Sequence, residues 1–307
     1  MERFADSDEV IDCIPKGIEI RTTIHGDIQI AIAELTESFN LLRQIAAQFN
    51  FTPVLVSFNP YHAVFEPHPP LNDYELKRRQ IYPEKQTAII PMLTLDPDLN
   101  ISIPGCSSEH LIALGKKLTY YSPYIVPFSF SSPFYKGDLW GGLSIRTFVR
   151  TGARPATMVF LEKREDLIKS TPSLPKVARI PAERGRIEFK AFDSCDDFQL
   201  YGALLALLKG IILDESLPGR IMIPDAKMHQ LSASKGFDRP DIFSEATKVL
   251  QAAEAALKDD GDVELLSRLK ESLSQRKTPA DRLIERFKSS RSIAAALQQT
   301  YIMSTDA

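Results

Sequence analysis

The segment Phe128–Phe160 reads FSFSSPFYKGDLWGGLSIRTFVRTGARPATMVF, and the rest of the chain is best interpreted outward from it. It combines small polar residues, a Pro-Phe step, the single Trp of the chain and a Gly-Gly pair. Neither a regular helix nor a regular strand uses such a mixture. Gly137, Gly141 and Gly142 permit turns that are closed to other residues and let a ligand approach the main chain. The segment therefore predicts a turn-rich region in the middle of the fold.

The same segment carries fixed positive charge. Arg146, Arg150 and Arg154 supply planar donor groups that suit a carboxylate or a phosphate. One interpretation is that the segment forms a wall of an anion site. The other is a structural loop with solvated Arg side chains, because most loops bind nothing even though most binding residues lie on loops. These residues alone leave both interpretations open.

The composition is that of an ordinary globular chain: 307 residues, 44% hydrophobic and 25% charged. The net charge of −3 argues against nucleic acid as the main partner. No apolar run approaches the ~20 residues of a membrane span, and the acidic start lacks the apolar core of a secretory signal. Cys13, Cys106 and Cys195 are widely spaced and fit a reducing compartment. We therefore expect a cytoplasmic protein without a membrane partner.

Alternating apolar and polar residues predict strands. Residues 17–24 alternate as a strand with one buried face does. Residues 186–193 alternate too, which places Glu188 and Lys190 on one face of a strand. Further strands are expected at 52–58, 87–93 and 99–103.

Apolar residues at helical spacing predict helices. The most apolar helix is expected at 198–213, with Asp196 or Asp197 as its N-cap. Ser107 or Ser108 is expected to cap another helix. The other helices are expected at 28–49, 109–120 and 162–170, and from residue 244 to the end.

This order of elements predicts an α+β protein in which helices cover one face of a sheet and the other face is wet. A site could lie on the wet face. We expect a catalytic-type α+β domain at 1–243 and a helical C-terminal extension at 244–307 that packs on the same domain. Residues 221–241, which Pro and Gly interrupt, are expected to be an irregular connection.

SSPFYKGD at 131–138, followed by Gly141, Ser144 and Arg146, resembles the S-P-F-x-x-G-x-D-T-G-x-x-S-x-R segment of type-two γ-glutamylcysteine ligases, the carboxylate–amine ligase family. One residue is inserted in this chain. Other segments resemble family elements in the same order: GIEIR at 17–21, His68-Pro69, LNISIPG at 99–105, GRIEFKAFD at 185–193 and TPADR at 278–282. The resemblance thus spans nearly the whole chain.

The resemblance implies a glutamine-synthetase-like fold, in which a curved antiparallel sheet forms a funnel covered by helices. It also implies an ATP-dependent carboxylate–amine ligase of the glutamate–cysteine ligase type. In that family ATP phosphorylates a glutamate-like γ-carboxylate, and an amine attacks the acyl phosphate. Such chemistry needs oxygen ligands for Mg²⁺ and cationic groups that hold phosphoryl and carboxylate oxygens. ATP, Mg²⁺ and a small amino-acid-like substrate are therefore the expected ligands, and a homo-oligomer is left open.

The matched segments assign roles to individual residues. The resemblance implies that Glu19, Glu188, Asn100 and Ser102 hold metal, and that Arg146 and Lys190 are catalytic. His68 and Ser132, from matched segments, and Arg150 and Arg154, from the cationic central segment, are expected to bind the substrate. Where the family has an Arg-rich segment, this chain offers Lys227, His229 and Lys235, which are expected to bind the nucleotide.

The chain also departs from the family pattern. Arg21 stands where the family has a second strand carboxylate. Asn100 and Ser102 stand where the family has two histidines, and both are neutral, weaker metal ligands. Lys190 replaces an Arg, so charge is kept but bidentate recognition is lost.

Two hypotheses follow. The chain is an active ligase with an altered metal site, or it is a catalytically impaired homologue that binds a small anion or a protein. In the second, Glu19 and Glu188 pair with Arg21 and Lys190 instead of metal. A metal-free hydrolase or transferase of γ-glutamyl compounds ranks last, because no activated Ser or Cys is evident.

Overall fold

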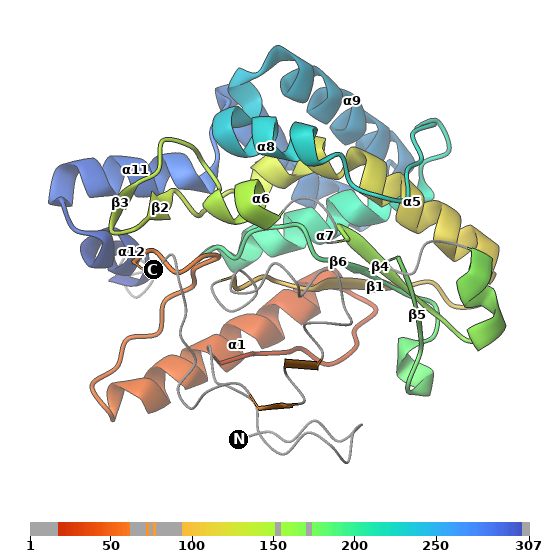
Figure 1. Cartoon of the computed structure of the whole chain (residues 1–307), viewed down its shortest axis with the longest axis horizontal. Helices are drawn as coiled ribbons and strands as arrows, with labels where there is room; N and C mark the ends of the chain where they lie inside the picture. Colours follow the sequence, from red (N-terminus) through yellow and green to blue (C-terminus); the bar gives the residue numbers. More distant parts are fainter. Residues whose placement is uncertain are drawn as a thin grey trace.

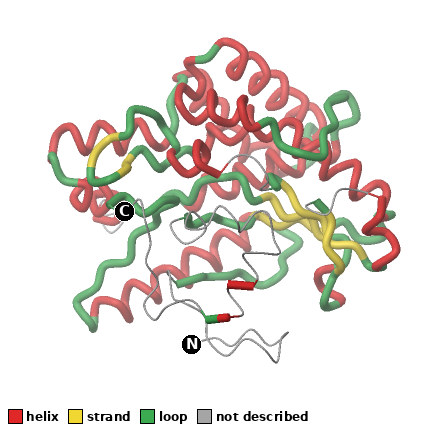
Figure 2. Tube along the Cα trace, viewed as in Figure 1, coloured by secondary structure: helices red, strands yellow, loops and turns green. Residues whose placement is uncertain are grey.

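The structure, a computed structural model, describes residues 18–61, 72–73, 76–77, 94–150, 155–169 and 174–302. Within them the helices outweigh the strands (Figure 1, Figure 2). The α-helices are α1 (Ile28–Ala47), α5 (Ser108–Ile125), α6 (Ile145–Arg150), α7 (Phe198–Leu213), α8 (Ala226–Lys235), α9 (Pro240–Ala256), α10 (Ser267–Gln275), α11 (Pro279–Ser290) and α12 (Ile293–Ile302). The strands are β1 (Leu99–Ser102), β2 (Phe134–Tyr135), β3 (Asp138–Leu139), β4 (Thr157–Leu161), β5 (Pro175–Val177) and β6 (Arg186–Phe189).

The main sheet of the described residues has the order β1-β6-β4-β5. Strand β6 is antiparallel to both β1 and β4, whereas β4 and β5 are parallel. Strands β2 and β3 form a separate hairpin inside the central segment. The expected α+β class with a mainly antiparallel sheet is therefore confirmed. The funnel shape of the glutamine-synthetase-like fold stays a prediction.

One face of the sheet is packed under α5 and α7. Val159, Ile187 and Phe189 point from the strands into the main hydrophobic core and are almost fully buried. Helix α5 approaches β4 closely because Gly115 has no side chain: a Cβ there would lie 2.8 Å from Val159 Cγ1. Figure 1 shows α5, α7, α8 and α9 gathered on the same side of the sheet. The opposite face carries the polar residues of β1 and β6.

Helix α7 lies at the centre of the helical layer. The sequence predicts its bounds correctly, with Asp197 as N-cap accepting a hydrogen bond from the Leu200 N–H. Helix α9 packs directly on it, since a Cβ at Gly210 would lie 2.6 Å from the Ala253 Cβ. The C-terminal helices thus share a core with the sheet-bearing part of the chain.

Helix α5 begins as expected and ends later than expected. Ser107 caps it by accepting a hydrogen bond from the His110 N–H. The helix continues to Ile125 through Pro123, which has no N–H to donate to Thr119. The Ser122 hydroxyl donates to that carbonyl instead, at 2.8 Å. A side chain therefore replaces the missing backbone bond.

Two expected strands are wrong. Residues 18–25 are not in a strand, and the Thr23 N–H donates to the Glu34 carboxylate of α1 instead of to a neighbouring strand. Residues 52–58 contribute one isolated bridge, Phe58 to Thr94. Local alternation shows that a segment can pair, but a partner must also lie alongside it. The strand expected at 87–93 lies outside the described residues.

Three other boundaries also needed correction. The connection expected at 221–241 contains α8, which Asp225 caps and which ends at Gly236. The helix expected at 162–170 is a short 3₁₀ helix, Arg164–Lys169. Strand β6 ends at Phe189, so the strand expected to reach residue 193 is shorter. Pro and Gly in residues 221–241 predict an irregular connection, whereas in the structure Pro224 and Gly236 border α8.

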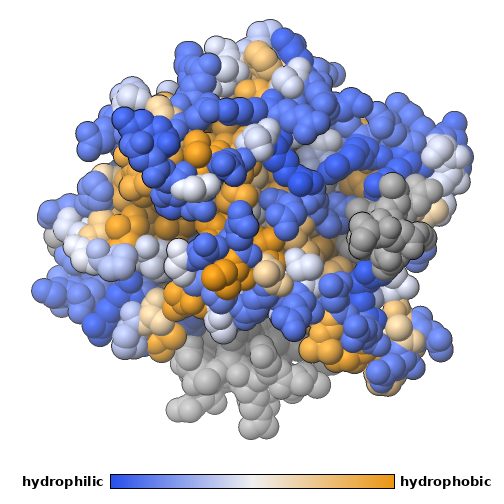
Figure 3. Space-filling view, turned by 180° about the vertical axis from the view of Figure 1, so that it is seen from behind, coloured by the Kyte–Doolittle hydropathy of each residue, from blue (hydrophilic) through white to orange (hydrophobic). Residues whose placement is uncertain are grey.

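None of the helices in the described residues is long and apolar enough to cross a membrane. Seen from behind, the surface is mostly hydrophilic with apolar areas between (Figure 3).

Candidate functional site

The wet face of the sheet brings several predicted site residues together. Asn100 pairs with Glu188, and Ser102 with Arg186, in the antiparallel register of β1 and β6. Paired residues of neighbouring strands project from the same face. Lys190 follows Glu188 by two residues and lies on this face too. We call Asp98, Asn100, Ser102, Arg186, Glu188 and Lys190 the charged face.

Ion pairs connect the charged face. The Lys190 ammonium lies 2.5 Å from Glu188 Oε1 and 2.8 Å from Asp98 Oδ1. The other Glu188 oxygen lies 3.3 Å from Arg186 Nη2. Arg186 in turn stacks 3.9 Å above the Phe160 ring. Both oxygens of Glu188 are thus engaged by cations.

Pairing shifts the pKa of Lys190, and burial shifts that of Asp98. Burial acts to lower the pKa of Lys190, but the attraction of Asp98 and Glu188 is larger, so its pKa is raised. Burial raises the pKa of Asp98, and the nearby Glu188 and Asp96 add to the rise against the opposing attraction of Lys190. Lys190 is therefore firmly charged, while Asp98 takes up a proton more readily than an ordinary Asp does.

Arg146 occupies a deeper position beside the charged face. Its side chain is 0% exposed and lies 3.4 Å from Asp193 Oδ1 and 3.0 Å from Asp96 Oδ2. It also donates to two backbone carbonyls, those of Lys190 at 2.8 Å and Ala191 at 3.0 Å. Four acceptors thus hold the guanidinium in place. In this geometry Arg146 organises the chain beside Lys190.

Asp193 is the centre of a buried polar network. It accepts hydrogen bonds from the Ser131 N–H at 3.0 Å and from the hydroxyls of Ser132 at 2.8 Å and Ser144 at 3.1 Å. Complete burial raises the pKa of Asp193, although Arg146 and these donors act in the opposite direction. The network joins the central segment to the end of β6. Both predicted residues in it, Ser132 and Arg146, have structural partners.

The acids of this region already face cations. Arg146 pairs with Asp96 and Asp193, Arg186 with Glu183 and Glu188, and Lys190 with Asp98 and Glu188. Within the described residues no group of three or more His, Cys, Asp or Glu side chains converges as a metal site. Mg²⁺ prefers carboxylate and water oxygens that no cation already holds. In this arrangement a Mg²⁺ ion at the charged face would have to displace Lys190 from Glu188. Lys190 and Arg186 are each 22% exposed, but Arg186 is also stacked on Phe160, so Lys190 is the cation better placed to exchange its partners for an anion.

Other predicted site residues lie apart from this face. Glu19 forms an exposed ion pair with Arg21, Nε to Oε1 at 2.7 Å, on its own segment. On α8 the Lys227 and Lys235 side chains are exposed. His229 is buried, with its Nε2 3.1 Å from the Ser122 hydroxyl. His68 and Arg154 lie outside the described residues, as does the side chain of Arg150.

Three acidic residues of this region were missed. Asp96 and Asp98 precede β1 in a D-P-D motif, and Asp193 closes the alternating pattern that begins at Arg186. Their position at strand ends was the available signal. Cys195 is a buried core residue, and burial raises its pKa to about 12, whereas Cys106 is only partly buried.

Comparison with models of known protein families finds no match. A curated protein of Ruegeria pomeroyi with the name "Putative glutamate--cysteine ligase 2" is 29% identical over 158 residues. The match covers 49% of this chain and 38% of that protein, so the chain spans well under two thirds of the relative. The similarity suggests the ligase family and supports a ligase-like function at this coarse level.

Proposed function

We propose that this protein is an ATP-dependent carboxylate–amine ligase of the glutamate–cysteine ligase type. It would form an amide on a glutamate-like γ-carboxylate through an acyl phosphate, with ATP and Mg²⁺ as cofactors. The observation that carries the proposal is the similarity to the Ruegeria pomeroyi protein. The charged face supports it, because β1 and β6 gather Asn100, Glu188 and Lys190 on one surface.

The proposal makes a demand on these residues. In the structure Lys190 occupies the position between Asp98 and Glu188 where a metal ion would otherwise be attracted. Catalysis then requires that an anionic substrate draws the ammonium away from Glu188, which frees carboxylate oxygens. Lys190 would hold the substrate carboxylate as a point charge. Arg146 would keep the Lys190 backbone in place through its hydrogen bond.

The test is an activity assay. Purified protein with Mg²⁺-ATP, glutamate and a panel of amines should release ADP and phosphate only when glutamate and a suitable amine are both present. Lys190→Gln should abolish this release, whereas Lys258→Gln, at an exposed position just after the end of α9, should retain it. Absence of turnover with every amine would contradict the proposal.

A second candidate is a catalytically impaired homologue that binds a small anion or a protein through the same face. The closed set of ion pairs around Glu188, and the Glu19–Arg21 pair, favour it. Calorimetry with ATP, with and without Mg²⁺, separates the two. Tight binding that depends on Mg²⁺ supports the ligase; binding of ATP or phosphate that Mg²⁺ does not improve supports the impaired homologue.

A further inference from the structure

A pocket of about 450 Å³ lies on the other side of β1 from the charged face. It is formed by the first turns of α5, the end of α7 and the loop that follows α7. Ile103, just beyond β1, shares the core-facing side with Leu99 and Ile101. The pocket volume is within the range of small-molecule sites. None of the residues assigned above to the ligase chemistry lines it.

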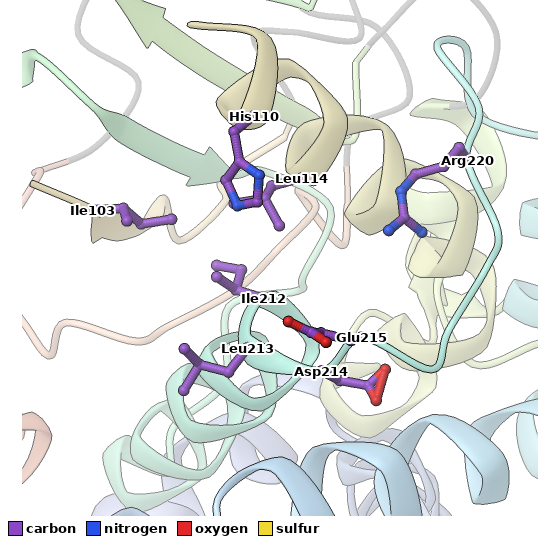
Figure 4. Close-up of a pocket in the computed structure, with 8 residues that line it drawn as sticks. All are labelled: Ile103, His110, Leu114, Ile212, Leu213, Asp214, Glu215 and Arg220. Carbon is purple, nitrogen blue, oxygen red and sulfur yellow. The ribbon is translucent and has the colours of Figure 1, made fainter. Parts of the chain in front are cut away.

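The pocket has a polar end and an apolar end (Figure 4). Arg220, Glu215 and Asp214 lie together at one end, and the Arg220 guanidinium is directed toward the carboxylates below it. The rest of the lining is His110 with four aliphatic side chains: Ile103, Leu114, Ile212 and Leu213. Leu213 is 53% exposed, so a ligand there would cover apolar surface that water now contacts.

The loop that carries the polar end is fastened to α5. The Lys117 ammonium, 1% exposed, lies 3.7 Å from Asp214 Oδ1 beneath the pocket. The Gly219 N–H donates to the Tyr121 hydroxyl at 3.1 Å, and a Cβ at Gly219 would lie 2.1 Å from Tyr120. Such contacts fix the loop before a ligand arrives, which lowers the entropic cost of binding.

The orientation of Arg220 is also fixed. Its Nη1 donates to the carbonyls of Leu217 and Gly219, both at 2.8 Å. The guanidinium held in this way lines the pocket. Asp214 is saturated by Ser216, Leu217 and Lys117, so its charge is already used. Glu215, which is exposed, is the carboxylate left for a ligand cation.

We infer that this pocket binds a free α-amino acid with an aliphatic side chain. Arg220 receives the carboxylate, Glu215 receives the ammonium, and the side chain lies among Leu114, Ile212 and Leu213. This pairing of a guanidinium, a carboxylate and an apolar end matches the three parts of such a ligand. The inference does not depend on the ligase proposal, because it uses different residues.

Calorimetry of the full chain with leucine and three of its relatives tests the inference. Leucine should bind at least about tenfold more tightly than glycine, which lacks the side chain. N-acetylleucine, without the ammonium, and leucinamide, without the carboxylate, should each bind at least about tenfold more weakly than leucine. Absence of leucine binding at millimolar concentration overturns the inference. Equal binding of all four compounds overturns it as well.

Variants then locate the site. Arg220→Gln should weaken leucine binding at least about tenfold and bring it close to that of leucinamide. Glu215→Gln should also weaken leucine binding at least about tenfold and bring it close to that of N-acetylleucine. Lys258→Gln and Glu285→Gln remove like charges from exposed positions outside the pocket and should bind as the parent protein does.

The charged face provides the remaining comparison. Lys190→Gln should leave leucine binding unchanged if the pocket is the site. If Lys190→Gln abolishes leucine binding while Arg220→Gln does not, the amino acid binds at the charged face and the inference is wrong. If leucine binds as inferred and no ligase activity is found, only the proposed function fails.

Discussion

Two cationic side chains lie next to each other in this protein and differ in what they can do. Arg146 is fully buried, and its guanidinium is shared among two carboxylates and two backbone carbonyls. The Lys190 ammonium pairs with Asp98 and Glu188 and keeps a part of its surface in solvent. Arg146 cannot leave its partners without exposing buried acids, whereas Lys190 can exchange partners. The difference separates the residue that builds the site from the residue that can act in it.

The largest effect is expected from Arg146→Met. It leaves Asp193 buried without its cation, so the free energy of unfolding should fall by about 3–5 kcal/mol. Urea denaturation measures this change. Arg268→Met removes an Arg from a partly exposed pair with Asp197 and should cost about 1 kcal/mol or less. If Arg146→Met is as mild as Arg268→Met but abolishes ligand binding, Arg146 is a ligand-binding residue after all.

Lys190→Gln should have a moderate effect on stability and a qualitative effect on metal binding. Without the ammonium, Asp98 and Glu188 repel each other and gain affinity for a divalent cation. Titration with Mn²⁺, followed by calorimetry, should show tighter binding by the variant than by the parent protein. Arg186→Gln removes a second cation from Glu188 and should change the affinity in the same direction, by less. Unchanged Mn²⁺ affinity would mean that Lys190 does not take the place of a metal.

Asp98→Asn tests the pH dependence of the charged face. The raised pKa means that folded protein holds the Asp98 proton more tightly than unfolded protein does. Stability of the parent protein should therefore fall, relative to Asp98→Asn, as pH rises from the ordinary value of 3.8 through the raised pKa. Urea midpoints of both proteins across this interval measure it. If the parent protein instead gains stability relative to Asp98→Asn as pH rises, attraction to Lys190 outweighs burial at Asp98.

The smallest effect is expected from Glu19→Gln. Its pair with Arg21 is about two-thirds exposed on both sides, so the free energy of unfolding should change by less than about 0.5 kcal/mol. Chemical denaturation measures this change in stability, and the assay with Mg²⁺-ATP, glutamate and amines measures any change in activity. A large loss of Mg²⁺-dependent activity with unchanged stability would restore the predicted metal role of Glu19.

The sequence predicts the helices well where their ends carry chemistry. Asp197 begins α7 as expected, and Thr278 with Asp281 forms a capping box at the start of α11 behind Pro279. These signals are local, because a capping side chain accepts its hydrogen bond from a backbone N–H only three residues later. Helix α8 was missed since its two borders, Pro224 and Gly236, were given more weight than the residues between them.

Strands and site depended on distant partners. Residues 17–24 and 99–103 carry similar alternation. Among the described residues the first segment, from 18 onward, forms no strand, whereas the second pairs with β6, which lies beside it. The segment Phe128–Phe160 contains three Arg residues, and nothing local shows that Arg146 is buried. Its partners lie 47 residues later in the sequence, at Asp193, and 50 residues earlier, at Asp96. Glu188 and Lys190, two residues apart on one strand, were predictable as neighbours.

The close contact between Gly210 and Ala253 has a consequence for how the chain can be divided. The backbones of α7 and α9 lie against each other and leave no room for solvent, so the contact surface of each helix is apolar where they cross. Removing residues 244–307 would uncover the most apolar helix of the protein. We expect the shortened chain, residues 1–243, to aggregate on expression. It should stay in solution only when residues 244–307 are synthesised together with it.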